Sequence, residues 1–185
     1  GISALLITGE EGHVLIDGGT EAGASVIAEN VRTVGFRLRD IKVLLHSHEH
    51  FDHVAGLAEL KKMSGARLFA SADAAPVLTS GVVSDKDPQA NMHDAFPAVE
   101  VDAVLNLAEP VVLGDLRLQA YATPGHTYGA LSWQWQSCEA TSCVNLVYAD
   151  SLSPVSRDDY RFSDHPEYVA AYRRGLAKLS ELDCQ

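Results

Sequence analysis

The chain has 185 residues, 46% of them hydrophobic, a length and composition that suit one folded domain with a substantial core. Its 25 acidic and 14 basic residues give a formal net charge of -11 and form no charged block. Nucleic acids and anionic membrane surfaces attract basic proteins, so this charge argues against both as partners. No apolar run approaches the roughly 20 residues that a membrane-spanning helix needs.

The first half of the chain alternates strands with helices. Apolar runs on both sides of the glycine-bounded loop 9–12 predict a β-hairpin. Thr20 can cap a helix that ends at Gly35 and carries an apolar face of Val26, Ile27, Val31 and Val34. The patterns predict strands at 4–8, 13–16, 41–45 and 67–70, helices over 20–35, from residue 54 and over 72–78, and an irregular loop over 81–99.

Strands dominate the second half, and a helix closes it. They are expected at 110–113, 116–122, 130–136 and 144–148, with the helix over 165–182. Asp164 and Glu167 have the spacing of a capping box at the start of this helix, and its apolar face is Tyr168, Tyr172, Leu176 and Leu179. Since no linker or repeat divides the chain, we expect one α/β (α+β) domain over residues 1–185, an αβ/βα sandwich.

A dense group of potential metal ligands follows the apolar run 41–45, which is typical of a strand buried on both faces. His48 and His50 project to the same side of an extended segment, and the chain then turns into a helix. Such donors suit zinc, with iron or manganese left open, whereas the alternative is a solvated histidine-rich loop. The group has four imidazoles and two carboxylates in eight residues: His46-Ser47-His48-Glu49-His50-Phe51-Asp52-His53.

The pattern His-x-His-x-Asp-His at residues 48–53 resembles the signature of the metallo-β-lactamase superfamily. Three further motifs follow the order of that family: Leu15-Ile16-Asp17-Gly18-Gly19, Thr123-Pro124-Gly125-His126-Thr127 and Tyr148-Ala149-Asp150-Ser151. The resemblance covers nearly the whole chain. It implies a sandwich of two mixed β-sheets covered by outer helices, present here as a partial domain that lacks both termini.

The resemblance also implies two zinc sites. His48, His50 and His126 match the three ligands of the first zinc, and Asp52 and His53 match two ligands of the second. In the family, the third ligand of the second zinc is a later histidine, which we expect beyond the end of this chain. His165 is the only late histidine, and we expect it to start a helix rather than to bind metal.

Within the superfamily, the motifs look most like those of subclass B3 metallo-β-lactamases, which implies a β-lactam substrate and a role in antibiotic resistance. Ser151 stands where other subclasses place a cysteine ligand. By resemblance, Ser151 and Ser153 contact water or the substrate carboxylate, although both can instead cap a strand end. We expect a monomer.

The three cysteines bear on the cellular compartment. Cys138 and Cys143 flank a polar stretch that can turn a hairpin and close a small disulfide, leaving Cys184 unpaired. Spacing alone leaves three free thiols as an equal alternative. A disulfide hairpin in some subclass members favours the bond, and with it a periplasmic or secreted protein.

The implied reaction is hydrolysis of the cyclic amide by a metal-bound hydroxide, with no covalent intermediate on the enzyme. His126 and Asp52 are the expected catalytic residues, because the first helps to hold the zinc that polarises the carbonyl and the second orients the hydroxide. Asp17 is expected to orient the histidine loop from behind the ligands. His46 and Glu49 are expected around the ligands or facing solvent.

Two other functions remain open. Another hydrolase of the same fold, such as a glyoxalase-II-like thioesterase or a lactonase, would use an aspartate resembling Asp150 to bridge both metals. Trp133 and Trp135 favour the lactamase, but at strand spacing they can simply pack a core face. A non-catalytic metal-binding module is the alternative from another class.

Overall fold

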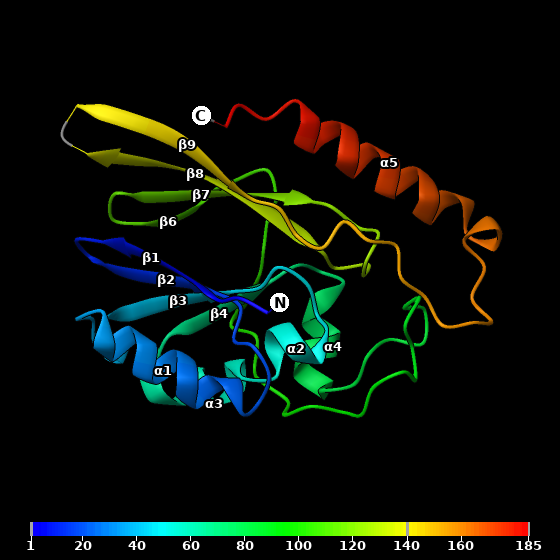
Figure 1. Cartoon of the computed structure of the whole chain (residues 1–185), viewed down its shortest axis with the longest axis horizontal. Coiled ribbons are helices and arrows are strands. Elements are labelled where there is room, and N and C mark those ends of the chain that lie inside the picture. The colour runs from blue at the N-terminus through cyan, green and yellow to red at the C-terminus, as the bar shows by residue number, and fades with distance from the viewer. Residues whose placement is uncertain (1, 140, 185) are drawn as a thin grey trace.

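The computed structural model describes residues 2–139 and 141–184, and it forms a sandwich of two β-sheets with helices outside (Figure 1). The first sheet has the strand order β1-β2-β3-β4-β5, in which β1 and β2 are antiparallel and the later pairs are parallel. Its strands are β1 (Leu5–Gly9), β2 (Gly12–Ile16), β3 (Ile41–Leu45), β4 (Arg67–Ala70) and β5 (Ala103–Val104).

The second sheet is antiparallel throughout its described strands, in the order β6-β7-β8-β9. These are β6 (Val111–Leu113), β7 (Leu116–Ala122), β8 (Leu131–Glu139) and β9 (Ser142–Tyr148). The predicted fold class is confirmed, with one difference: only the first sheet is mixed. Each connection in the second sheet joins neighbouring strands, and such hairpins require antiparallel pairing.

Five helices lie mainly on the outside of the sandwich: α1 (Gly23–Thr33), α2 (Phe51–Val54), α3 (Leu57–Ser64), α4 (Ala74–Ser80) and α5 (Pro166–Ser180). In Figure 1, α1 and α3 lie below the first sheet, and α5 runs above the second. Short 3₁₀ turns at Leu38–Asp40 and Phe162–Asp164 complete the elements. None of the helices in the described part of the chain has the length and apolar character needed to cross a membrane.

Strand β3 is buried on both faces, as its apolar run predicts. Leu44 packs into the core between the first sheet and its helices, whereas Val43 and Leu45 pack into the core between the sheets. Trp133 and Trp135 of β8 also lie in the core between the sheets, because alternate residues of a strand share a face. The packing interpretation of the two tryptophans is therefore confirmed.

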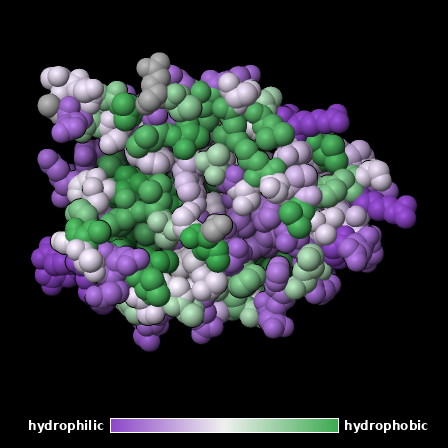
Figure 2. Space-filling view, in the orientation of Figure 1, coloured by the Kyte–Doolittle hydropathy of each residue, from purple (hydrophilic) through white to green (hydrophobic). Residues whose placement is uncertain are grey.

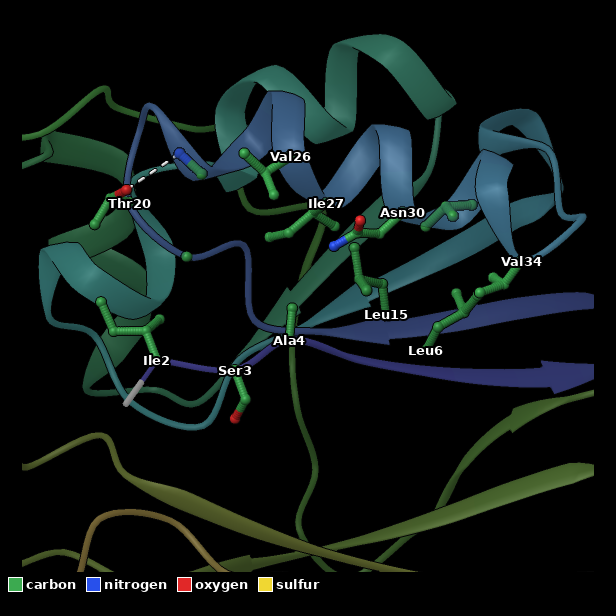
Figure 3. Close-up of a pocket in the computed structure, with 13 residues that line it drawn as sticks. Ile2, Ser3, Ala4, Leu6, Leu15, Thr20, Val26, Ile27, Asn30 and Val34 are labelled. Carbon is green, nitrogen blue, oxygen red and sulfur yellow. Dashed lines mark hydrogen bonds between the residues drawn. The ribbon is translucent and has the colours of Figure 1, made fainter.

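The buried face of α1 differs from the prediction. Ala24, Ala28 and Val31 are buried, whereas Val26 and Val34 are 59% and 64% exposed. Small alanines let the helix approach the core closely, and the larger side chains then point outward. Val26 and Val34 line an apolar groove of about 510 Å³ between α1 and the first two strands (Figure 3).

The two predicted helix caps had different outcomes. Gly23 at the start of α1 donates its N–H to Thr20 Oγ1 over 3.1 Å, so Thr20 stabilises the helix start from three residues ahead. The capping box at Asp164 is wrong: His165 precedes α5 without a side-chain hydrogen bond to it. Pro166 occupies the first turn instead, where its missing N–H leaves no donor unsatisfied.

The helix predicted from residue 54 is two helices, α2 and α3, that meet at Gly56. A Cβ atom at Gly56 would overlap the carbonyl oxygen of Gly18, in the turn that follows β2. The turn therefore packs directly against the junction of the two helices, and only glycine allows this approach. This contact places the junction of α2 and α3 beside the turn that follows β2.

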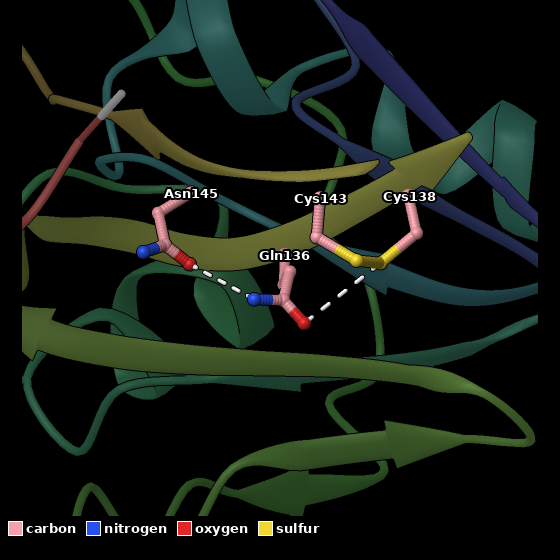
Figure 4. The surroundings of a disulfide bond; sticks show 4 residues. All are labelled: Gln136, Cys138, Cys143 and Asn145. Atoms are coloured by element: carbon pink, nitrogen blue, oxygen red, sulfur yellow. Dashed lines mark hydrogen bonds between the residues drawn. A yellow bond between two sulfur atoms is a disulfide. The ribbon is translucent and has the colours of Figure 1, made fainter. Parts of the chain in front are cut away.

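The β8–β9 hairpin ends in a disulfide between Cys138 and Cys143, which face each other across the two strands (Figure 4). The predicted pairing is confirmed, and Cys184 is a free, exposed cysteine. Figure 2 shows hydrophobic side chains gathered between β1 and the second sheet. A hollow of about 620 Å³ lies there, lined in part by Leu5, Leu116, Trp135 and Leu146.

Candidate metal centre

The segment after β3 carries the predicted ligands, and the turn after β2 holds it in place. Asp17 adopts a left-handed backbone with φ 68°, a conformation that aspartate tolerates better than most residues. Its buried carboxylate accepts the backbone N–H of Ser47 over 2.6 Å and the Ser47 hydroxyl over 2.7 Å. The carboxylate therefore fixes the path of the chain immediately before His48.

His48, His50 and His126 lie together, although the last two are 76 positions apart in the sequence. Their ring centroids are 4.7 to 5.1 Å apart, and each can offer one nitrogen within 4.8 Å of the others. The group meets at the end of β3, where the backbone N–H of Leu131 donates to the carbonyl of Ser47. The predicted first site is thus brought together by both sheets.

Two of these three rings donate a hydrogen bond from Nδ1 to an acceptor behind them. His48 Nδ1 donates to Asp150 Oδ1 over 2.7 Å, and His126 Nδ1 donates to the carbonyl oxygen of Ser153 over 2.8 Å. These bonds leave the lone pair of each ring on Nε2. His48 Nε2 has no other partner among the described residues, and His126 Nε2 lies 3.4 Å from the side-chain nitrogen of Gln89. Ser153 acts here through its main chain.

A second group consists of His48, Asp52 and His53, which can likewise place one ligand atom each within 4.8 Å of the others. His53 Nδ1 donates to Asp17 Oδ2 over 2.8 Å, and His53 Nε2 lies 3.8 Å from Asp52 Oδ2. Burial lowers the pKa of His53, but the hydrogen bond and charge of Asp17 outweigh it and raise the pKa above its usual value. The two groups are adjacent, since the rings of His48 and His53 are 4.0 Å apart.

The first group has the chemistry of a metal site. His48 Nε2 is buried and has no hydrogen-bond partner among the described residues. Burial, followed by the neighbouring histidines, lowers the pKa of His48 well below its usual value, so this ring stays neutral and keeps a lone pair on the unpartnered atom. A buried, uncompensated lone pair is costly unless it binds something, and neutral imidazole is a common ligand of first-row metals.

Asp150 lies behind His48 rather than among the grouped ligand atoms. Its Oδ1 holds His48, its Oδ2 has no partner among the described residues, and burial raises its pKa to about 6. Within the described chain, Asp150 belongs to neither group of potential metal ligands. The geometry differs from that of an aspartate that bridges two metals.

His46 and Glu49 are both buried, at 0% and 3% exposure, so of the two predicted positions the one around the ligands is observed and the one facing solvent is not. Glu49 accepts the Thr127 hydroxyl over 2.6 Å and the Gly129 N–H over 2.9 Å, and burial raises its pKa to about 7. Burial lowers the pKa of His46 to about 4, and its Nε2 accepts the N–H of Ser71. Glu49 thereby ties the histidine loop to the loop that carries His126.

The remaining predicted residues lie around this centre. Ser151 is half-buried and directly follows Asp150, and the Ser153 side chain is exposed. His165 stacks on Tyr160 with centroids 4.5 Å apart and belongs to neither group of ligands in the described residues. Sequence reasoning missed Asp87, whose Oδ1 lies 3.2 Å from His50 Nε2.

Comparison with known proteins now identifies the family. The family model described as the metallo-beta-lactamase superfamily matches residues 1–174. The chain belongs to the metallo-beta-lactamase superfamily. Two of its four motifs, at residues 48–53 and 123–127, supply both groups of potential metal ligands, and the sequence-based resemblance is confirmed.

Solved structures of this superfamily are similar over the whole chain. The MIM-2 metallo-beta-lactamase superposes with a TM-score of 0.94 at 56% identity, covering 100% of this chain and 67% of that one. MEM-A1, a subclass B3 metallo-beta-lactamase isolated from a soil metagenome library, gives a TM-score of 0.92 at 41% identity, covering 100% and 71%. The similarity extends from the fold to the sequence.

A more distant relative is the hydroxyacylglutathione hydrolase of Rhodopseudomonas palustris. It is 29% identical over 161 residues, which make up 83% of this chain and 54% of that protein. The chain therefore spans about half the length of this curated relative. Both kinds of relative carry names of hydrolases.

Proposed function

We propose that the protein is a zinc-dependent β-lactamase of subclass B3, which hydrolyses the cyclic amide of β-lactam antibiotics. The observation that carries this proposal is the convergence of His48, His50 and His126 on one point beside Asp52 and His53. Identities of 41% and 56% to metallo-beta-lactamases over the whole chain support the substrate class. The net charge of -11 gives no support for a nucleic-acid partner.

Zinc fits the donor set, since it binds imidazole nitrogen and carboxylate oxygen in sites that leave a position open for water. His48, His50 and His126 would hold a first zinc, and Asp52 and His53 would contribute to a second. When bound, zinc lowers the pKa of water towards neutrality and polarises a carbonyl, which are the two requirements of amide hydrolysis at neutral pH.

The side chains of this protein then position the reactants. Asp52 is one-third exposed at the start of α2, so its carboxylate can accept a hydrogen bond from the attacking water and align it. The hydrogen bond to the Ser153 carbonyl holds the His126 ring in place, and the ring faces His48 and His50 from the side of the second sheet. Ser151 and Ser153 begin the segment after β9, where their hydroxyls can bind the carboxylate of the substrate.

The disulfide supports a location outside the cytosol. A bond between Cys138 and Cys143 persists in an oxidising compartment, so we place the protein in the periplasm or outside the cell. There a β-lactamase meets the antibiotic before it reaches its target, which would confer resistance. We further propose that the protein acts as a monomer.

A thioesterase is the second candidate, because the Rhodopseudomonas palustris relative is named a hydroxyacylglutathione hydrolase. The position of Asp150 argues against it, since this carboxylate supports His48 and lies outside both groups of ligands. The identity to that relative, 29%, is also lower than the identity to the lactamase structures.

Turnover of two substrates separates the candidates. The zinc-loaded protein should hydrolyse the chromogenic β-lactam nitrocefin, and a chelator should abolish this activity until zinc is restored. His126→Ala should lose it as well, whereas His165→Ala, at a histidine outside both groups, should keep it. Hydrolysis of S-lactoylglutathione without nitrocefin would overturn the proposal in favour of the thioesterase, and zinc binding without either activity would indicate a non-catalytic module.

A further inference from the structure

A short segment of the loop at residues 81–99 is buried beside the metal centre. Residues 87–90 are all buried, whereas the three residues before them and the three after them are exposed. The segment thus dips into the protein between two exposed stretches. Asp87, its first residue, is 2% exposed, and a carboxylate is rarely buried to this degree without a partner.

The partners of Asp87 are His50 and its own loop. Asp87 Oδ1 lies 3.2 Å from His50 Nε2 and accepts the backbone N–H of Gln89 over 2.7 Å. A carboxylate only accepts hydrogen bonds, so the contact with His50 requires the ring proton to be on Nε2. The Nδ1 atom of His50 then carries the lone pair.

We propose that Asp87 is a positioning residue that fixes the ring orientation and tautomer of His50, so that Nδ1 faces the metal. This inference rests on the proposed zinc-dependent function. An orienting carboxylate also increases the basicity of a ligating imidazole and strengthens its bond to the metal. Asp87 would therefore raise the affinity of the first site.

The other histidines of the centre show the same arrangement. The ring of His48 is held by Asp150, that of His53 by Asp17 and that of His126 by the carbonyl of Ser153. Those three partners lie in or next to the motifs of the family, at residues 15–19 and 148–151. Asp87 completes the set from a loop that carries no motif.

Arg157 anchors the buried segment to the chain that follows β9. Its guanidinium donates to the carbonyl oxygen of Asp87 over 2.9 Å, and its backbone N–H donates to the carbonyl of Pro88 over 2.9 Å. The main chain at Asp87 is thus fixed from two sides. The carboxylate stays next to His50 even though the adjoining stretches of the loop are exposed.

Three variants test the role of Asp87 in the full protein. Asp87→Leu removes the acceptor and keeps a side chain branched at the same atom, although a larger one. Asp87→Asn keeps an oxygen that can accept from Nε2, and Asp85→Asn is the control at an exposed acid of the same loop. Zinc affinity is measured by competition with a chromophoric chelator, and the His50 tautomer by ¹⁵N NMR of the zinc-loaded protein.

We expect Asp87→Leu to weaken zinc binding about 10- to 100-fold. Asp87→Asn should weaken it less than about tenfold and retain the Nε2–H tautomer of His50. Asp85→Asn should bind zinc as the wild type does. If Asp87→Leu does not fold, the affinity and tautomer of Asp87→Asn decide. Wild-type zinc affinity in a folded Asp87→Leu, or an Nδ1–H tautomer of His50 in the wild type, would overturn the role of Asp87 alone. Failure of the wild type to bind zinc would overturn the proposed function, and this role with it.

Discussion

Replacing Asp17 by asparagine tests whether the turn after β2 organises the metal centre. The Asp17 carboxylate is fully buried and accepts four hydrogen bonds: from the N–H and hydroxyl of Ser47, from His53 Nδ1 and from the Tyr148 hydroxyl at 3.2 Å. Asparagine has one acceptor oxygen in place of two and presents its amide N–H₂ to the remaining donors. Oδ1 accepts the Ser47 N–H and Oδ2 accepts the other three bonds. Asparagine with its oxygen at the Oδ2 position therefore loses the bond to the Ser47 N–H, and the other three bonds lose their charged acceptor.

The size of the effect follows from the charge of the acceptor. A hydrogen bond to an ionised group contributes about 1.5 to 3 kcal/mol and one to a neutral group about 1 kcal/mol, so one lost bond and three weakened ones amount to at least about 3 kcal/mol. Tyr148 is only partly buried, and its hydroxyl can turn to water, which keeps the loss near that lower value. We expect the free energy of unfolding of metal-free Asp17→Asn to fall by about 3 kcal/mol in urea, without a change in the m-value.

Metal content provides a second measurement on the same variant. His53 loses its charged partner in Asp17→Asn, whereas His48 keeps Asp150. We expect zinc affinity at the Asp52–His53 position to fall about 10- to 100-fold while the first site stays filled. The control is Asp158→Asn at an exposed acid. Unchanged stability of the metal-free variant, or equal losses at both sites, would refute this reasoning.

Three further substitutions test contacts away from the ligands. Burial raises the pKa of Asp102, but its partner Lys61 and a backbone N–H outweigh burial and hold the pKa below its usual value. The ionised carboxylate therefore stabilises the fold above the unfolded pKa near 3.8, and this stabilisation is lost as the pH falls through the folded pKa. We expect Asp102→Asn to lower the unfolding free energy by about 1 kcal/mol at pH 7, with the difference vanishing in acid. Gly56→Ala should cost about 3 kcal/mol by denaturant unfolding, because its Cβ would overlap the carbonyl oxygen of Gly18. Replacing both Cys138 and Cys143 by serine should cost about 2 kcal/mol and leave zinc affinity unchanged.

Each of these three predictions has a result that would contradict it. If the unfolding free energies of Asp102→Asn and the wild type differ as much at pH 3 as at pH 7, the ion pair is not the source of the difference. Gly35 has φ 92°, and a Cβ atom there would meet nothing within 4 Å, so Gly35→Ala should cost only about 1 kcal/mol of backbone strain. Equal losses in the two glycine variants would argue against steric overlap. Loss of zinc from the variant with two serines would contradict the expectation that the disulfide does not affect the metal site.

Elements with a periodic pattern could be predicted from the sequence, and shorter ones could not. The mainly apolar run 41–45 coincides with β3, in which every residue but Lys42 is buried, because a strand buried on both faces is apolar at most of its positions. Strand β5 has two residues and so carries no period at all. The buried face of α1 was mistaken because Ala24 and Ala28 contribute a weaker hydrophobic signal than the exposed valines of the same helix.

The ligands were likewise easier to predict than the residues that hold them. His48 and His50 stand in one dense cluster, and the family pattern adds His126. The contact of Asp87 with His50 spans 37 residues and depends on the path of an irregular loop, so no local pattern marks it. The sequence left the place of Glu49 open between the surroundings of the ligands and solvent for the same reason, since its partners Thr127 and Gly129 come from the loop between β7 and β8.

The bonds of Glu49 to the His126 loop have a consequence for how the ion would enter and leave. They join the two halves of the centre by protein contacts alone, so the entropy of gathering distant ligands is lost when the chain folds rather than when metal binds. Stripping the metal should then leave an ordered, refillable cavity instead of an unfolded chain, unlike small zinc domains that fold only around their ion. Such a protein stays folded in a zinc-poor environment and binds zinc again without refolding.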